Sequence, residues 1–409
     1  MVKKMNKKIS LGAAIGIMAL IAAATFIITY NYSMKVFNAT VKNVSEKEES
    51  YTKLSEMDKY VRGNYFGEID EQLLTDSIMN GYVQGIGDQY SVYLTAEEYA
   101  DVLQSDAGVT VGLGFTWERE ESGYIKVSSV KDSSPASSAG VKAGDIITAV
   151  NNTDVIAYEN GYEEASGLLS CAEGTKVKLH IKRVGDDGLS DFFSVDLTSA
   201  KTEIVSVTSS LIENVGYIKI TTFNDKTASQ LRNALTNVIE SGAESLVFDL
   251  RGNSGDLMTA LGDSLDCIIG DCDVVKAKFS DREEYVVHTT EAEKISMPMA
   301  VIVNSGTASC GELFALALRD ESNAQLVGTS TAGKGVMQYT HKLSGGAAVK
   351  LTVATVETKN SGSFNGTGVK PNFEVALPSD VDLETLTEEN RLTLDTQLIK
   401  AVEVVQTIL

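Results

Sequence analysis

The chain contains little proline, cysteine or histidine. Its 409 residues include 4 prolines, 4 cysteines and 3 histidines. So few prolines exclude proline-rich linkers and collagen-like repeats. No HExxH motif and no pair of histidines four residues apart occurs, and the spacing of Cys267 and Cys272 differs from that of zinc-binding CxxC pairs. We therefore expect neither a metal nor any other cofactor.

Positive charge is also scarce. Lysine and arginine number 35 against 56 acidic residues, which gives a formal net charge of −21. A surface this acidic repels phosphate backbones, and no basic stripe offsets it, so we expect no nucleic-acid partner. With 43% hydrophobic and 22% charged residues, the chain is too apolar to be disordered and long enough for two or three domains.

The N-terminus has the pattern of a membrane anchor. Four lysines within residues 1–8 precede residues 9–30, which carry no charged side chain. About 20 apolar residues span a bilayer, and a signal peptide usually has a shorter apolar stretch. The pattern predicts a cytoplasmic N-terminus, one transmembrane signal-anchor and a chain that lies outside the cell membrane after Lys35. A cleaved signal peptide is the alternative.

The rest of the chain divides by its pattern into four segments. Residues 31–50 are polar and read as a stalk, and 51–106 show the spacing of amphipathic helices, with a capping-box motif at Thr95. Residues 107–199 contain short strand-like runs typical of a compact β module. From residue 200 to 409, strands alternate with helices. We expect a multidomain α/β protein whose last domain contains a mixed sheet.

Ser309 lies where a buried strand turns into a helix. The segment around it reads Asn304-Ser-Gly-Thr-Ala-Ser-Cys-Gly-Glu312. A serine hydroxyl at such a turn lies near the unpaired N–H groups of the helix, which can bind an oxyanion. A serine or threonine at this position also commonly caps the helix and has no chemical role.

Lys334 stands between Gly333 and Gly335. A lysine is usually a solvated surface residue. Flanked by two glycines, it has no bulky neighbours in sequence and can also enter a narrow pocket. There, loss of water favours the neutral amine, which can act as a base for a serine nucleophile.

Together these two segments resemble the signature of the carboxyl-terminal processing peptidases, also called tail-specific proteases. The second segment reads Gly333-Lys-Gly-Val-Met-Gln338. In that family, a serine and a lysine 25 positions later form a catalytic dyad. The resemblance implies that Ser309 is the nucleophile, that Lys334 is the general base and that Gln338 orients the lysine.

The segment Asp249-Leu-Arg-Gly-Asn-Ser-Gly-Asp256 is similar to the family's Leu-Arg-x-Asn-x-Gly-Gly turn. The resemblance assigns the two oxyanion donors to the N–H groups of Gly255 and Cys310. Asp256 replaces the second glycine of the turn and places a carboxylate near the expected oxyanion, where negative charge opposes the reaction. A second departure is Asp88-Gln-Tyr-Ser91, where the family usually has Asp-Pro-Tyr-Ser.

A PDZ domain is indicated by Gly112-Leu113-Gly114-Phe115 together with Ser134-Pro-Ala-Ser-Ser-Ala-Gly and Gly144-Asp-Ile-Ile. In a PDZ domain, the loop formed by the first motif binds a C-terminal carboxylate with backbone N–H groups, and the peptide adds as a strand to a sheet edge. The resemblance therefore predicts peptide binding at Gly112, Leu113, Gly114 and Phe115.

The expected protein is a membrane-anchored, extracytoplasmic serine endopeptidase that cleaves near the free C-termini of proteins or peptides held by its PDZ domain. Further copies of the same chain, in a homo-oligomer, are among the partners considered. Two alternatives remain. One is a Ser-His hydrolase that uses His341 or His288. The other is an anchored PDZ scaffold whose peptidase domain is weakly active or inactive, as Asp256 would suggest.

Overall fold

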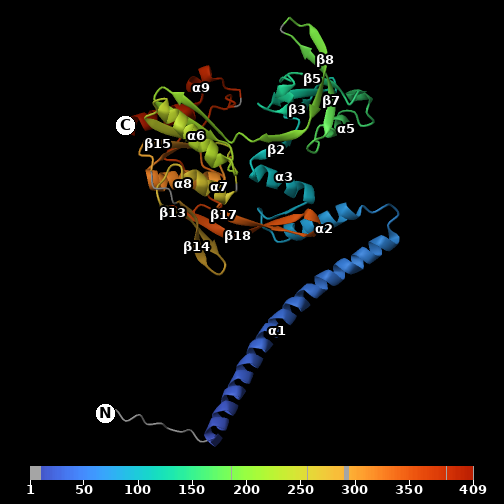
Figure 1. Cartoon of the computed structure of the whole chain (residues 1–409), viewed down its shortest axis with the longest axis vertical. Helices are drawn as coiled ribbons and strands as arrows, with labels where there is room; N and C mark the ends of the chain where they lie inside the picture. The colour runs from blue at the N-terminus through green and yellow to red at the C-terminus, as the bar shows by residue number, and fades with distance from the viewer. Residues whose placement is uncertain (1–10, 186, 256, 290–293, 384, 409) are drawn as a thin grey trace. The chain divides into compact units, whose positions relative to one another are not determined.

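The structure is a computed structural model that describes residues 11–185, 187–255, 257–289, 294–383 and 385–408 (Figure 1). The chain divides into two units, Met1–Ile78 and Met79–Leu409. The lysines that precede the apolar segment, and Asp256, lie outside the described residues.

The first unit is dominated by one helix, α1 (Leu11–Asn64), which Figure 1 shows in blue. Its segment Gly16–Lys35 has a mean hydropathy of 1.5 and is not buried, so it is long and apolar enough to cross a membrane. The predicted stalk, residues 31–50, is a continuous part of α1. The helix α2 (Glu71–Gln84) begins in this unit and ends in the second.

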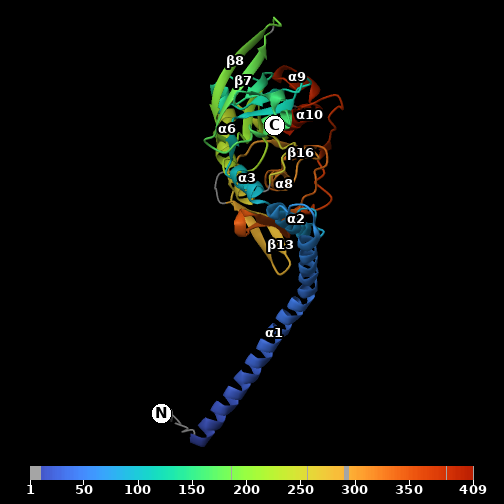
Figure 2. The ribbon, with the colours of Figure 1, turned by 90° about the vertical axis from the view of Figure 1, so that its right-hand side faces the viewer.

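The predicted β module is an antiparallel sheet around a small core. Its order is β3-β4-β5-β7-β8, with the short β6 paired to β5. The strands are β3 (Phe115–Arg119), β4 (Ile125–Val130), β5 (Ile146–Val150), β6 (Thr153–Asp154), β7 (Lys176–Val184) and β8 (Ser190–Thr198). Figure 2 shows β7 and β8 as a long hairpin. Fully buried Ile125, Val127 and Leu179 belong to its core.

Two further strands bracket this module. β2 (Val109–Gly112) enters it and pairs antiparallel with β9 (Ala200–Glu203), which leaves it. The helices α4 (Pro135–Ser138) and α5 (Tyr162–Gly167) complete it. Gly114 has a φ of +90°, and a Cβ there would lie 2.1 Å from the Cβ of Ser134, so this position of the loop requires glycine.

The α/β domain contains the mixed sheet that the sequence predicts, in the order β10-β11-β12-β15-β16-β20. β10 and β11 are antiparallel, and the other neighbours are parallel. The strands are β10 (Val207–Ile212), β11 (Val215–Ile220), β12 (Ser245–Asp249), β15 (Met299–Val303), β16 (Gln325–Gly328) and β20 (Phe373–Glu374). All residues of β12 and β15 are buried, as their uninterrupted apolar sequence requires in a parallel sheet covered on both faces.

Helices cover both faces of this sheet. Leu231, Leu261 and Leu313 pack in one core cluster and come from α6 (Thr227–Glu240), α7 (Met258–Leu265) and α8 (Cys310–Ser322). On the other face, Leu398 and Val405 of α10 (Thr396–Ile408) pack against β-strand residues such as Val247 and Ile302. The short α9 (Glu388–Leu394) precedes α10.

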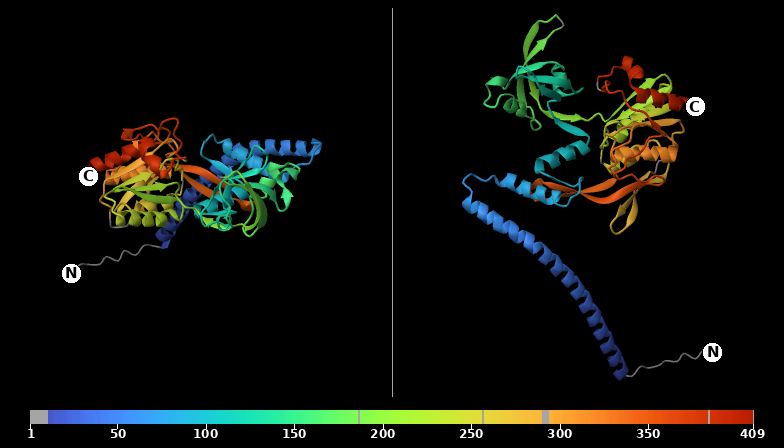
Figure 3. Two further views of the ribbon diagram at one scale, coloured as in Figure 1. Left: turned by 90° about the horizontal axis from the view of Figure 1, so that it is seen from above. Right: turned by 180° about the vertical axis from the view of Figure 1, so that it is seen from behind.

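A second sheet carries β17 (Val336–Lys342) and β18 (Ala348–Thr358), which lie side by side in Figure 3. β18 also pairs with β13 (Cys272–Phe279), β19 (Gly362–Ser363) and β1 (Val92–Leu94), and β13 pairs with β14 (Glu283–Thr289).

The strand β1 corrects the expectation of helix throughout residues 51–106. Gly85 and Gly87 follow α2, the chain then becomes extended, and Val92, Tyr93 and Leu94 pair with β18. Helix resumes at α3 (Ala96–Asp106), which begins with the predicted capping box between Thr95 and Glu98. The helical spacing of apolar residues did not reveal the strand because three residues are too few to show a period of two.

A buried ionic network joins the end of β12 to the start of α10. The Arg251 guanidinium binds Asp249 at 2.6 Å and Asp395 at 2.7 Å, and all three side chains are at most 4% exposed. Asp395 Oδ1 also accepts the N–H of Leu398 in the first turn of α10. The network therefore fixes both the glycine-rich turn after β12 and the helix behind it.

We predict that Asp395→Ala lowers the free energy of unfolding by about 3 kcal/mol, because Arg251 would keep its buried charge with one partner fewer. Equilibrium denaturation with urea measures this change. Glu403→Ala, an exposed position of α10 that pairs only with Lys400 among the ion pairs described, is the control and should cost under about 0.5 kcal/mol. Equal losses in the two variants would contradict the importance of the network.

Candidate active site

Ser309 lies immediately before α8, in the turn that follows β15. Its side chain is 2% exposed, and its backbone has φ 51° and ψ −114°, a conformation that is strained for a residue with a Cβ. Two hydrogen bonds hold the turn. Thr307 Oγ1 donates to Leu250 O at 2.8 Å, and Ala308 N donates to Asn253 O at 2.8 Å. The turn after β12 thus fixes the turn that carries Ser309.

Lys334 is half-buried and lies between two glycines that the fold requires. A Cβ at Gly333, which has a φ of +82°, would lie 2.7 Å from Gly368 N. A Cβ at Gly335 would lie 2.7 Å from Asn365 N. Both glycines therefore permit a close approach of backbone to backbone, and this places Lys334 in a packed loop instead of on an open surface.

Glu312 connects the two residues. Its carboxylate oxygen Oε2 accepts the backbone N–H of Ser309 at 3.0 Å and that of Lys334 at 2.9 Å. The other oxygen, Oε1, accepts the N–H of Gly333 at 2.8 Å and the hydroxyl of Thr331. Ser309 N and Lys334 N therefore lie within two hydrogen-bond lengths of each other, because both donate to one oxygen atom.

The Glu312 side chain is fully buried, and burial raises its pKa although four hydrogen bonds favour the charged form. Sequence reasoning assigned no role to Glu312. Its position three residues after Ser309 is the spacing of a capping box, and this signal could have identified it.

Gln338 and Lys334 both contact Tyr90. The Gln338 side-chain N–H donates to Tyr90 O at 2.6 Å. The ammonium nitrogen of Lys334 lies 5.6 Å from the centroid of the Tyr90 ring, within the range of a cation–π contact. Lys334 and Gln338 thus lie close together, beside Tyr90. From the sequence, Tyr90 was noted only as part of the motif Asp88-Gln-Tyr-Ser91.

The two N–H groups expected to form the oxyanion hole are already hydrogen-bonded. Cys310 N donates to Gly255 O at 3.1 Å, and Gly255 N donates to Asn253 Oδ1 at 3.2 Å. A Cβ at Gly255 would lie 2.7 Å from Phe223 N, so the turn is tightly packed. In this conformation, neither N–H is available to an oxyanion.

The histidines of the Ser-His alternative lie on exposed parts of two strands. His341 is exposed on β17, and His288, exposed on β14, pairs with Asp273 at 2.9 Å. Within the described parts of the chain, no hydrogen bond joins a histidine to Ser309, and no group of three His, Cys, Asp or Glu side chains could hold a metal ion.

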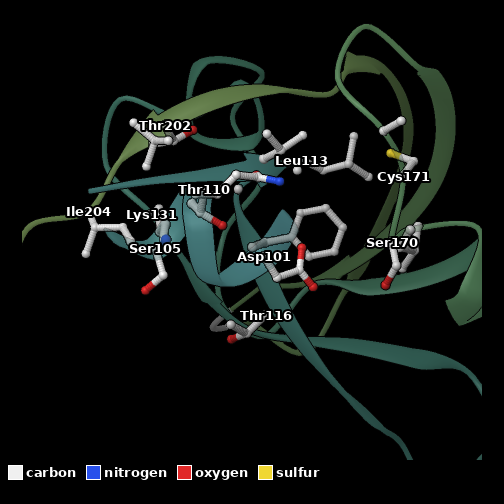
Figure 4. A pocket seen from close by; sticks show the side chains of 18 of the residues that line it. Asp101, Ser105, Thr110, Leu113, Thr116, Lys131, Ser170, Cys171, Thr202 and Ile204 are labelled. Carbon is white, nitrogen blue, oxygen red and sulfur yellow. The ribbon is translucent and has the colours of Figure 1, made fainter. Parts of the chain in front are cut away.

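The predicted peptide-binding loop borders a cavity of about 710 Å³ (Figure 4). Gly112, Leu113, Gly114 and Phe115 line it, together with Lys131 and residues 169–172 of the β module. Glu97, Asp101, Gln104 and Ser105 of α3 line it as well. No pattern in the sequence indicates that α3 lies beside the loop.

Fold and motifs define a serine peptidase with a PDZ domain, and comparison with known proteins agrees. The family model of the PDZ domain matches residues 111–193, and that of peptidase family S41 matches residues 214–375. The carboxy-terminal processing protease CtpA of Bacillus subtilis is 31% identical over 388 residues, which cover 93% of this chain and 80% of that protein. A probable CtpA-like serine protease of Staphylococcus haemolyticus is 27% identical over 95% of this chain and 77% of its own length.

Among solved structures, the photosystem II D1 C-terminal processing protease is 26% identical, with a TM-score of 0.46, and the match covers 83% of this chain and 90% of that one. An S41 protease from Bacteroides fragilis shares the fold at 18% identity, with a TM-score of 0.51, over 85% of this chain and 99% of that one. The chain belongs to peptidase family S41 and is a serine-type carboxyl-terminal processing peptidase with a PDZ domain.

We predict that Glu312→Gln lowers kcat about tenfold to a hundredfold, because an amide has only one accepting oxygen and leaves a buried N–H of the Ser309 or Lys334 segment unpaired. Steady-state cleavage of a peptide substrate measures kcat. Glu321→Gln, near the end of the same helix, should leave kcat unchanged. Wild-type kcat in Glu312→Gln would show that the shared carboxylate is dispensable.

Proposed function

We propose that this protein is a membrane-anchored endopeptidase that works outside the cytoplasm and uses Ser309 and Lys334 as a catalytic dyad, with Gln338 orienting the lysine. The observation that carries the proposal is the hydrogen bonding of Ser309 N and Lys334 N to a single oxygen of Glu312. Such an arrangement fixes the two segments at a short distance, as proton transfer between their side chains requires.

In the proposed reaction, Lys334 Nζ takes the proton of the Ser309 hydroxyl while Oγ attacks the carbonyl carbon of the scissile peptide bond. Lys334 then gives this proton to the leaving amine as the C–N bond breaks, which leaves an acyl-enzyme. Water deacylates it by the same steps, with Lys334 again as the base.

The developing oxyanion would be held by the N–H groups of Cys310 and Gly255. Since Cys310 N donates to Gly255 O in the present structure, this carbonyl must move before the donor can serve. We infer that substrate binding rearranges the turn of residues 252–255. Asp256, next to this turn, remains a candidate for opposing the oxyanion.

The PDZ domain would bind the substrate's free C-terminus at Gly112–Phe115 and so raise its effective concentration at the dyad. The segment Gly16–Lys35 would hold the protein in the cell membrane, since its length and hydropathy suit a transmembrane helix. A second candidate function is an anchored PDZ scaffold with an inactive peptidase domain. The hydrogen bond between Cys310 and Gly255 favours it, because the oxyanion site is closed.

Substitution of the dyad separates these functions. Ser309→Ala and Lys334→Ala should each lower kcat by about three orders of magnitude or more while peptide binding persists. Cleavage of a protein with an unstructured apolar C-terminus, by the chain from Lys35 onward, measures the effect, and EDTA should not change it. His341→Ala is the control and should keep wild-type activity. If the wild type is inactive but binds C-terminal peptides, the scaffold is the better description.

Capture of the C-terminus has its own test. Amidating the C-terminus of a substrate should raise KM about tenfold, since the backbone N–H groups of the loop lose a charged acceptor. Gly114→Val should have a similar effect, because any Cβ there meets Ser134. Equal KM values for amidated and free-acid substrates would refute capture by the loop while leaving the dyad untouched.

A further inference from the structure

Residues 88–91 form a short segment held against the sheet that carries Gln338. Asp88 accepts hydrogen bonds from the N–H of Tyr90, at 3.3 Å, and from the hydroxyl of Ser91. The Ser91 oxygen in turn accepts the N–H of Thr352 at 3.1 Å. Thr352 is the neighbour of Gln338 across β17 and β18. These side-chain hydrogen bonds therefore fix the segment next to Gln338.

Tyr90 contacts Gln338 through its backbone carbonyl and Lys334 through its aromatic ring. Its carbonyl oxygen accepts the N–H of Gln338, and its ring lies beside the ammonium of Lys334. With its NH₂ group bound to Tyr90, the Gln338 amide keeps its oxygen as an acceptor for another group. A lysine side chain has many rotamers, and a cation–π contact with an aromatic face favours those that keep the ammonium beside the ring.

We propose that Tyr90 is a positioning residue of the reaction: its ring holds the Lys334 side chain, and its carbonyl fixes the rotamer of Gln338. The inference rests on the proposed dyad. Tyr90 touches neither the substrate bond nor Ser309 in this role, so its loss should reduce kcat and leave KM unchanged.

Substitutions of the ring alone test this role. Tyr90→Phe keeps the aromatic face and should retain kcat within about twofold, whereas Tyr90→Leu should lower kcat about tenfold or more at constant KM. Tyr339→Leu is the matched control. It lies next to Gln338 on β17, but its ring packs near Phe279, and it should keep wild-type kcat. Wild-type kcat in Tyr90→Leu would overturn the proposal.

If Tyr90→Leu loses activity only because it folds poorly, a substitution that keeps the shape of the ring distinguishes this from loss of the cation–π contact. Pentafluorophenylalanine at position 90 has nearly the size of phenylalanine but an electron-poor face, so it should lower kcat relative to Tyr90→Phe at the same thermal unfolding midpoint. Equal kcat for the two rings would leave Tyr90 with a packing role only. If Ser309→Ala and Lys334→Ala retain activity, the dyad itself is wrong; if they lose it and the Tyr90 variants do not, only this inference fails.

A different observation concerns the cavity beside the PDZ loop. Four of its lining residues, Glu97, Asp101, Gln104 and Ser105, follow one face of α3 with helical spacing. Asp101 and Ser105 are labelled in Figure 4 with Leu113 of the loop. The cavity is therefore bordered by residues from outside the match to the PDZ family model as well as from inside it.

Charge is distributed unevenly around this cavity. The charged lining residues are Glu97, Asp101 and Lys131. Lys131 N donates to Gly114 O at 2.9 Å, so its backbone adjoins the loop, and burial lowers the pKa of its side chain. No ion pair involves Glu97 or Asp101 in the described part of the chain. Both side chains are exposed, so their negative charges are accessible to a ligand in the cavity.

From this distribution we infer that the cavity selects substrate tails that carry a lysine or arginine a few residues before an apolar C-terminal residue. The inference rests on the proposed capture of tails. The terminal carboxylate would bind at the loop near Lys131, and the basic side chain would lie near Glu97 and Asp101. An acidic residue at the same place in the tail would be repelled.

Binding of fluorescent peptides to the Ser309→Ala protein tests the inference. A tail with lysine at the third to fifth position from its C-terminus should bind about threefold to tenfold more tightly than one with glutamate, and high salt should remove the difference. Joint Glu97→Lys and Asp101→Lys should reverse the preference. The same change at Glu163 and Glu164 of α5, which do not line the cavity, is the control.

Equal affinity for the two tails at low salt would overturn the selectivity. The same experiment includes an amidated tail. If amidated and free-acid tails bind equally, capture of the C-terminus fails as a whole. If the free acid binds better but charge within the tail has no effect, only the role of Glu97 and Asp101 is refuted.

Discussion

The carboxylate of Glu312 is the group on which the candidate active site depends. It is fully buried and accepts hydrogen bonds from three backbone N–H groups and one hydroxyl, which belong to two segments far apart in sequence. A buried carboxylate is costly unless such partners surround it. Because breaking any of these bonds costs free energy, the carboxylate holds the Ser309 turn and the Lys334 loop at a fixed distance from each other.

Other features bring this carboxylate to its place. The completely buried β15 is followed by the turn that carries Ser309, and Glu312 lies in the first turn of the next helix, α8. Gly333 and Gly335 allow the Lys334 loop to pack against the backbone of residues 365–368. The Arg251 network anchors the turn after β12, whose Asn253 accepts the N–H of Ala308. Burial of β15 thus positions Glu312, backbone packing positions the Lys334 loop, and the charge pairs of Arg251 position the turn after β12.

Much of this architecture could be predicted from local patterns. The buried strands β12 and β15, the helices that follow them, the PDZ motifs and the mixed sheet were all expected, because each shows in a continuous stretch of sequence. The contact of Tyr90 with Gln338 and that of Glu312 with Lys334 could not be, since they join residues that only the folded chain brings together. The bond from Cys310 to Gly255 was also unforeseen: the motif names the two residues but not the conformation of the turn.

One covalent path connects the two regions that a substrate would need. After Tyr90 the chain forms β1, then α3, then β2, and reaches the loop of Gly112 without any long irregular segment. The helix α3 lines the cavity beside the loop of Gly112. The segment that precedes β1 and α3 contains Tyr90, which contacts Gln338 and Lys334. A substitution in α3 therefore acts on an element that lines the cavity and that is connected through three strand residues to the segment beside Lys334.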